Sequence, residues 1–166
     1  MVAPWLHDAA IVKEIYGGEE GVAMRLAKAQ VARERYVSTG LVDYLPAASN
    51  VDPNAAMYWT GDALDYYLNP NRGAIPQWGA RFAVMAWKEW LEFDPIVLSP
   101  RMKVPVRIVS SEQSATPGGA KRFAAGLQVP HEVVWTTGTQ FDFYDNPSTV
   151  RFGADQAIAH FLKTLA

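Results

Sequence analysis

The stretch VPVRIVSSEQSATPGGAKRFAAGL, residues 104–127, decides the fold class of this chain. Its first part, VPVRIVSS, is a β-branched run that ends in a polar cluster, which is typical of a strand. Its second part offers Thr116 as a helix cap and Pro117 at the first helical position, followed by apolar residues at helical spacing. We therefore expect a strand and then a helix over these residues.

The same alternation continues toward the C-terminus. HEVVWTT, residues 131–137, predicts a second strand, and a second helix is expected to start at Pro147 with Asn146 or Asp145 as its cap. That helix carries an apolar stripe made of Val150, Ala154, Ala157, Ile158, Phe161, Leu162 and Leu165. Strand, helix, strand, helix in this order predicts an α/β fold with a parallel sheet and right-handed crossovers.

Residues 9 to about 94 have a different pattern, with helix and loop signals and many aromatic residues. GEEGVAMRLAKAQVARERY, residues 18–36, predicts a helix whose inward positions are Val22, Leu26, Ala29 and Tyr36. IPQWGARFAVMAWKEWLEF, residues 75–93, is apolar on nearly every side and predicts a helix that is buried or covers something. Between them, residues 45–73 are rich in Pro, Asn and Gly, which indicates loops around short helices.

Composition excludes several classes of function. The chain has 166 residues, which suits one domain, and a formal net charge of −2 without a basic run, which argues against nucleic acid as a partner. It has no cysteine, so disulfides, thiolate nucleophiles and cysteine metal sites are excluded. Its start, MVAPWLHDAAIV, has neither the basic region of a signal peptide nor an apolar stretch long enough for a membrane span. We expect a cytoplasmic protein without a membrane partner.

The C-terminal third resembles the last two strands and two helices of an α/β-hydrolase, nearest the dienelactone-hydrolase-like branch. The resemblance is carried by VPVRIVSSEQSATPGGAKRFAAGL, by VVWTTGTQFDFYD and by the closing AIAHFL, while VAPWLHD near the start resembles the end of the sixth strand of that fold. It implies the end of a sheet strand at 1–8, a helical cap over 9–100, and the C-terminal α/β half of the hydrolase core at 101–166.

The nucleophile of such an enzyme is missing from the sequence. An α/β-hydrolase carries its serine or cysteine in a G-x-S-x-G turn between a strand and a helix. No G-x-S-x-G occurs in the chain, and none of its serines is flanked by glycines in that pattern. The family's nucleophile and oxyanion elements would precede Met1, so the resemblance covers only the C-terminal half of the fold.

Two positions match the remaining members of the catalytic triad. Glu112, directly after the first strand, matches the family's acid, which orients the catalytic histidine; the alternative is a solvated loop residue. Gln140 stands where the family has the histidine. A glutamine side chain does not titrate near neutral pH and cannot act as a general base, so a binding or loop-fixing role is favoured. Asp142 and Asp145 are expected to hold the turn and cap the last helix.

A base could also have moved to another histidine. Of the three histidines, His131 should open a strand at the end opposite the site, and His160 should lie on a boundary or exposed face of the last helix. His7 is the one expected at the catalytic end of the sheet, where it is either a structural residue or a positioning group near the substrate. With no carboxylates at ligand spacing around these histidines, no metal site is predicted.

The aromatic residues of 9–100 allow a binding role. Trp59 and Trp87, together with other aromatic residues of this range, could line an apolar substrate pocket, although packing in a core is the more common use of such residues.

Three hypotheses follow. The first is an ester or lactone hydrolase lineage, inactive as the isolated chain and completed by an N-terminal hydrolase half. The second is a non-catalytic module that forms homo-oligomers through its edge strand, and the third is a small-molecule binder. None of them requires a cofactor.

Overall fold

The chain has a mixed α/β fold that divides into two units. Unit 1 combines Met1–Ile15 with the chain from Phe93 onward, and unit 2 is Tyr16–Glu92. The structure, a computed structural model, describes residues 1–165. Both ends of unit 2 lie inside the range 9–100 that the resemblance implies to be a cap.

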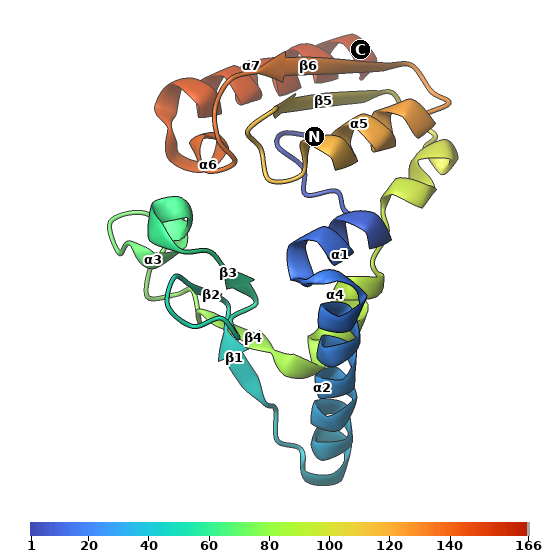
Figure 1. Ribbon diagram of the computed structural model, residues 1–166. Coiled ribbons are helices and arrows are strands. Elements are labelled where there is room, and N and C mark those ends of the chain that lie inside the picture. The colour runs from blue at the N-terminus through green and yellow to red at the C-terminus, as the bar shows by residue number, and fades with distance from the viewer. Residues whose placement is uncertain (166) are drawn as a thin grey trace. The chain divides into compact units, whose positions relative to one another are not determined.

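A parallel sheet forms the centre of unit 1 (Figure 1). Its strands are β5 (Val106–Ser111) and β6 (His131–Thr136), paired in register from Val106 opposite His131 to Ser111 opposite Thr136. This confirms the two predicted strands and their parallel arrangement. The outer side of β5 is paired with the start of the chain, because Ala3 N donates to Val109 O (2.8 Å) and Val109 N donates to Met1 O (2.9 Å). Residues 1–3 therefore extend the sheet as a short parallel neighbour of β5.

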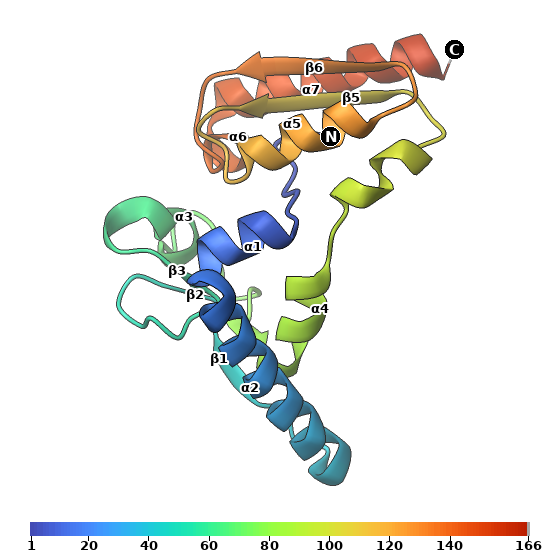
Figure 2. The same ribbon diagram turned by 45° about the vertical axis from the view of Figure 1, so that its right-hand side comes forward.

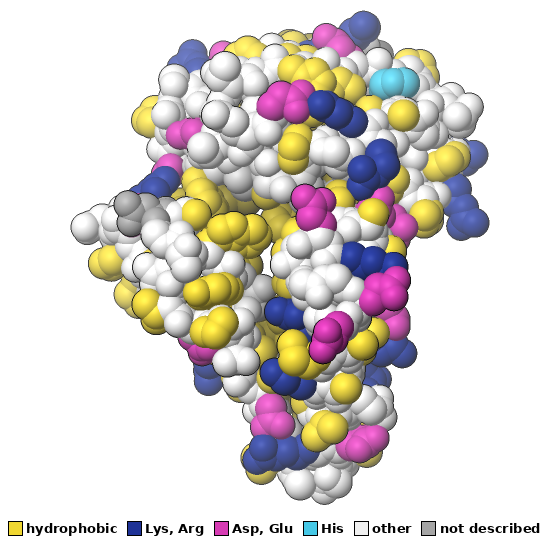
Figure 3. Space-filling view, in the orientation of Figure 1, with side chains coloured by type: hydrophobic (Ala, Val, Ile, Leu, Met, Phe, Trp, Pro, Cys, Tyr) yellow, Lys and Arg dark blue, Asp and Glu magenta, His cyan; other side chains and the backbone are white. Residues whose placement is uncertain are grey.

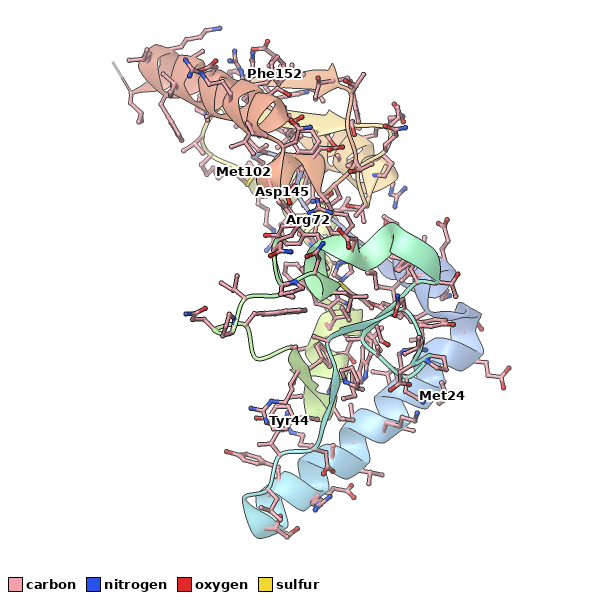
Figure 4. All side chains as sticks on the ribbon, turned by 90° about the vertical axis from the view of Figure 1, so that its left-hand side faces the viewer. Met24, Tyr44, Arg72, Met102, Asp145 and Phe152 are labelled. Atoms are coloured by element: carbon pink, nitrogen blue, oxygen red, sulfur yellow. The ribbon has the colours of Figure 1, made fainter. Side chains whose placement is uncertain are left out.

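Helices cover both faces of this sheet, because successive side chains of a strand point to opposite sides. Figure 2 shows α5 in front of the sheet and α7 behind it. On the α5 side the buried core consists of Leu6, Val106, Ile108, Ala120, Phe123, Ala124 and Leu127. On the other side Val109 packs with Ala3, Phe143 and, from α7, Phe152 (Figure 4). The helices of unit 1 are α1 (Ala9–Tyr16, whose last residue opens unit 2), the 3-10 helix η3 (Ile96–Arg101), α5 (Pro117–Gly126), α6 (Asp142–Asp145) and α7 (Pro147–Thr164).

The two predicted helix caps differ in outcome. Asn146 caps α7, since its side chain accepts hydrogen bonds from Ser148 N (3.1 Å) and Thr149 N (3.4 Å). Thr116 stands at the cap position of α5 but its side chain makes no capping bond. Its hydroxyl instead accepts from Leu6 N (3.1 Å), so this residue ties the N-terminal segment to α5.

The apolar stripe predicted for α7 does not pack on the sheet. The helix buries Gly153 and turns Phe152 and Ala157 partly inward. Four other large apolar residues of the helix are exposed, namely Val150, Ile158, Phe161 and Leu162, and so is Leu165, which follows its last residue. The helix itself is present as predicted, but α7 rests on the sheet with the face that carries Phe152 and Gly153, which lies opposite most of this stripe.

Unit 2 is built on the long helix α2 (Gly18–Thr39), which confirms the helix predicted over 18–36. It buries Ala29 and Ala32 and packs along α4 (Trp87–Glu92). Tyr36, expected to face inward, is exposed and lies in the last turns of α2.

The helix predicted over 75–93 is only partly present. Its range contains β4 (Arg81–Ala83), the 3-10 helix η2 (Val84–Ala86) and then α4. Antiparallel pairing of β4 with β1 (Tyr44–Pro46) overrides the local helix preference, and Ala80 before it has a positive φ of 48°. The other elements of unit 2 are β2 (Ala48–Ser49), β3 (Met57–Tyr58), η1 (Gly61–Leu64) and α3 (Asp65–Leu68).

Candidate functional site

A buried polar cluster lies where β5 and β6 end. In parallel α/β sheets this end of the strands is where sites usually form. The cluster joins the loop after β5, the loop after β6 and the N-terminal segment, and all three belong to unit 1. Its buried members are Ser110, Ser111, Ser114, Thr116 and Gln140.

Gln140 is the centre of this cluster and is only 8% exposed. Its carbonyl oxygen Oε1 accepts a hydrogen bond from Ala115 N (3.0 Å). Its amide nitrogen Nε2 donates to Ala3 O (2.9 Å) and to the hydroxyl of Tyr144 (3.0 Å). Both N–H groups and the carbonyl of the amide are thus engaged, and they connect three separate segments of the chain.

The serine hydroxyls of the cluster are bonded to the backbone and to each other. Ser114 Oγ donates to Ser111 O (2.8 Å) and lies 3.0 Å from Ser110 Oγ, while Ser111 Oγ donates to Gly138 O. A serine nucleophile has to pass its proton to a base. Here the hydroxyl protons of Ser111 and Ser114 point at carbonyl oxygens, an arrangement that fixes loops.

Glu112 lies on the surface beside this cluster. Its side chain is 66% exposed, and its carboxylate forms an ion pair with Lys121 (2.8 Å) on α5. The Lys121 ammonium also lies over the ring of Trp135, 5.1 Å from the ring centre. Within the described residues, Glu112 and Gln140 share no hydrogen bond; the carboxylate of Glu112 is paired with Lys121, and the amide of Gln140 is bonded to other groups.

His7 is buried next to the N-terminal segment. Its Nδ1 accepts a hydrogen bond from Trp5 Nε1 (2.8 Å), and its ring meets Phe93 edge-on at 5.6 Å. Because an indole N–H can only donate, we assign the proton of the neutral imidazole to Nε2. His131 opens β6, as predicted, and His160 is half-buried on α7.

Asp8 is a carboxylate that the sequence reasoning did not single out. It accepts hydrogen bonds from Ala10 N (3.1 Å) and Ile11 N (3.0 Å), so it caps α1, and it pairs with Arg122 (2.8 Å). Burial acts to raise the pKa of Asp8, but the hydrogen bond from Ile11 and the charge of Arg122 outweigh it and hold the pKa below its ordinary value. The available signal was an aspartate directly before a helical pattern.

Asp142 holds the turn after β6, as predicted. Its carboxylate accepts from Thr139 N (2.6 Å) and from Thr139 Oγ1 (2.9 Å), and this turn contains Gly138 at a φ of 113°. The hydrogen bond from the Thr139 backbone, with that from its hydroxyl, lowers the pKa of Asp142.

Replacing Asp142 by asparagine should reduce stability at neutral pH and make it less sensitive to acid. A lowered folded-state pKa means that the charged carboxylate stabilises the fold above its unfolded pKa of about 3.9, and that this stabilisation is lost as the pH falls through the folded-state value. We expect a loss of at most about 1 kcal/mol at pH 7, because the site is open to water.

Urea unfolding of the wild type and D142N at pH 7 and pH 3 checks this expectation. The difference between the two proteins should shrink at pH 3, whereas Asp155→Asn on α7 should show little difference at either pH. An Asp142→Asn effect of equal size at both pH values would contradict the role assigned to the charge.

The two tryptophans predicted to contact substrate lie in unit 2 in different environments. Trp87 is 1% exposed and packs against Tyr16 and Phe82, with ring centres 5.1 and 4.7 Å away. Trp59 follows β3 and is 47% exposed. A shallow hollow on unit 2 contains neither of them and is lined by Leu26, Ala29, Gln30, Arg33, Met85, Lys88 and Glu92.

The charged side chains of the described residues do not gather into a cluster that would indicate a binding site for a metal ion. Among residues 1–165, no group of three or more His, Asp or Glu side chains is placed to hold a metal ion. On the face shown in Figure 3, acidic and basic side chains alternate along the helices of unit 2. No helix in the described part of the chain is both long and apolar enough to cross a membrane.

Comparison with known proteins gives a likeness of fold only. No protein-family model and no curated protein matches the chain. Among solved structures, it is similar to the crystal structure of the hypothetical protein PA2218 from Pseudomonas aeruginosa, with a TM-score of 0.69 and 16% sequence identity. The alignment covers 98% of this chain and 52% of that one, so the chain spans about half the length of the solved relative.

Proposed function

We propose that this chain is the scaffold half of an α/β-hydrolase-type protein of the ester and lactone lineage, and that its own side chains do not catalyse hydrolysis. The observation that carries the second part is the bonding of Gln140, whose amide groups all hold backbone or side-chain partners. The hydrolase lineage itself is supported by the sequence resemblance and by the parallel sheet with helices on both faces.

Acyl transfer needs an attacking oxygen, a base that takes its proton, and donors for the developing oxyanion. In this chain the position of the base holds an amide without a titrating group, and the nearby hydroxyls of Ser111 and Ser114 donate to carbonyl oxygens. The attacking oxygen would therefore come from a partner polypeptide. Glu112, already at the surface, is the acid that this chain could offer, and no cofactor is needed. We place the protein in the cytoplasm.

An esterase assay on the purified chain tests the absence of catalysis. With p-nitrophenyl butyrate as substrate, the rate should equal that of buffer with an unrelated protein, and it should not change in Ser111→Ala or Ser114→Ala variants. Turnover by the chain alone that disappears when one of its serines is replaced would overturn the proposal.

Replacing Gln140 by leucine should destabilise the chain by about 2 kcal/mol, because the buried carbonyl of Ala3 and the partly buried N–H of Ala115 lose their partner. Chemical denaturation followed by circular dichroism measures the loss. Gln128→Leu is the matched control, since Gln128 is exposed and its removal should stay within about 0.5 kcal/mol. Equal stability of wild type and Q140L would show that Gln140 does not fix the loops.

A further inference from the structure

One side of α2 is turned away from the interior of unit 2. Its exposed residues fall within an arc of about 100° around the helix, and we call them the open face: Glu20, Met24, Ala27, Lys28, Val31 and Arg35. The buried Ala29 is about 140° from Met24, so the open face points to solvent. Met24 is 48% exposed and Val31 is 66% exposed.

The middle of the open face is apolar and borders a shallow hollow. Met24 and Val31 lie about two turns apart on the same side of the helix, with the exposed Ala27 between them. The hollow is lined by Ala27, Lys28, Val31, Ala32, Asp43 and Val84. Large exposed apolar side chains beside a hollow form a continuous apolar surface, which is typical of an interaction site.

The charges of the open face are arranged by sign along the helix. Glu20 lies at its start, whereas Lys28 and Arg35 lie in its second half. Within the described chain neither Glu20 nor Lys28 has an ion pair, and Arg35, paired with Asp43 at 2.5 Å, is still 52% exposed. A two-fold axis brings each end of such a surface onto the opposite end of its copy, so the open face is complementary in charge to itself.

We propose that the open face is a dimer interface, in which two copies of α2 lie antiparallel about a two-fold axis near Ala27 and Lys28. In this register Met24 stands opposite Val31 of the second copy and covers the hollow beside it, and Glu20 stands opposite Arg35 of the second copy. Each of these contacts occurs twice. The interface uses unit 2 alone, unlike the oligomer expected through the edge strand, and it does not rest on the proposed function.

A second copy is the occupant that this order of charges favours. Any other polypeptide would need the same charges in reverse order, whereas a second copy supplies them by symmetry. Two parallel copies would place Glu20 against Glu20, and like charges in contact oppose association. The contact spans only a few turns of one helix, so we expect a weak dimer that forms at high protein concentration.

Analytical ultracentrifugation of the full chain over a wide range of concentrations tests the interface. The wild type should pass from monomer to dimer as the concentration rises. Glu20→Lys and Arg35→Glu should each weaken the dimer about tenfold, because each variant places two pairs of like charges in the interface. An equimolar mixture of the two variants should dimerise as the wild type does, since both pairs are then opposite in sign.

The matched control is Glu92→Lys, which changes the net charge equally at an exposed position of α4, outside the open face. It should leave the dimer unchanged, and all three variants should melt near the wild-type temperature because their side chains are exposed. A wild type that stays monomeric, a dimer that Glu20→Lys does not weaken, or a mixture that does not recover would each overturn the proposal.

Cysteine cross-linking tests the register, since the chain has no cysteine of its own. Under mild oxidation a mixture of M24C and V31C should give a disulfide-linked dimer, because the two positions stand opposite each other. Val37→Cys, exposed and about 120° from Val31 around α2, should not cross-link to M24C. If M24C linked to itself faster than to V31C, the antiparallel register would be refuted.

Discussion

Gly119→Ala should destabilise unit 1 by about 3 kcal/mol, at the upper end of what overpacking a core costs. Gly119 lies in α5, where the helix crosses the N-terminal segment. A Cβ at this position would lie 1.8 Å from Leu6 O and 2.9 Å from Leu6 C, which are backbone atoms that cannot move aside as a side-chain end can. The methyl group would have to push α5 away from the segment that Thr116 also holds.

The neighbouring glycine provides the matched control. A Cβ on Gly118 would meet only the end of the Arg122 side chain, at 3.4 Å. Gly118→Ala should therefore be neutral or stabilise the chain by about 0.4–1 kcal/mol, since it restricts the unfolded state without a clash. Urea unfolding followed by circular dichroism measures both variants. If G119A and G118A had the same stability, the close approach of α5 to Leu6 would be refuted.

The sequence predicts the parts of the fold that depend on local patterns. The strands β5 and β6 are correctly predicted, because β-branched runs are typical of buried strands. The start of α7 is also correctly predicted, because Asn146, one of the two cap candidates, is a residue type that caps helices well and is followed by Pro147. The two adjacent glycines of α5 look alike in the sequence. Only the position of Leu6, more than a hundred residues earlier, makes one of them essential.

Tertiary packing decides the parts that the sequence does not predict. The helix α7 and the helical spacing of its apolar residues could be predicted from the sequence. Which face of this helix contacts the sheet could not, because it depends on how Gly153 packs against Val2. The sequence of residues 75–93 predicts a helix. In the structure, residues 81–83 in the middle of that range form β4, which pairs with β1.

The candidate site shows the same division. The loop that holds Gln140 could be located from the sequence, through the resemblance, and a loop-fixing role follows from the chemistry of an amide. Its partners could not be located, because Ala3 and Ala115 come from distant segments that meet only in the folded unit. The capping role of Asp8 was not predicted, although an aspartate directly before a helical pattern is a signal for it, and its ion pair with Arg122 depends on the packing of α5.

Trp87→Ala should destabilise unit 2 by about 3–5 kcal/mol, the usual cost of removing a large buried aromatic side chain. Trp87 packs against Tyr16 and Phe82, and the guanidinium of Arg25 lies over its ring at 5.3 Å. Its replacement would leave a cavity that these groups can fill only in part.

The variant Trp59→Ala is the control that distinguishes packing in a core from the lining of a substrate pocket. Because Trp59 is about half exposed, its loss should change stability by no more than about 0.5 kcal/mol. Denaturation followed by far-ultraviolet circular dichroism suits both variants, since each removes a fluorescent residue. If Trp87→Ala were as mild as Trp59→Ala, Trp87 would not be part of the core of unit 2, and the interpretation of these aromatic residues as the lining of a substrate pocket would gain support. A large loss confined to Trp87→Ala instead shows that its ring is needed to hold α2 and α4 together.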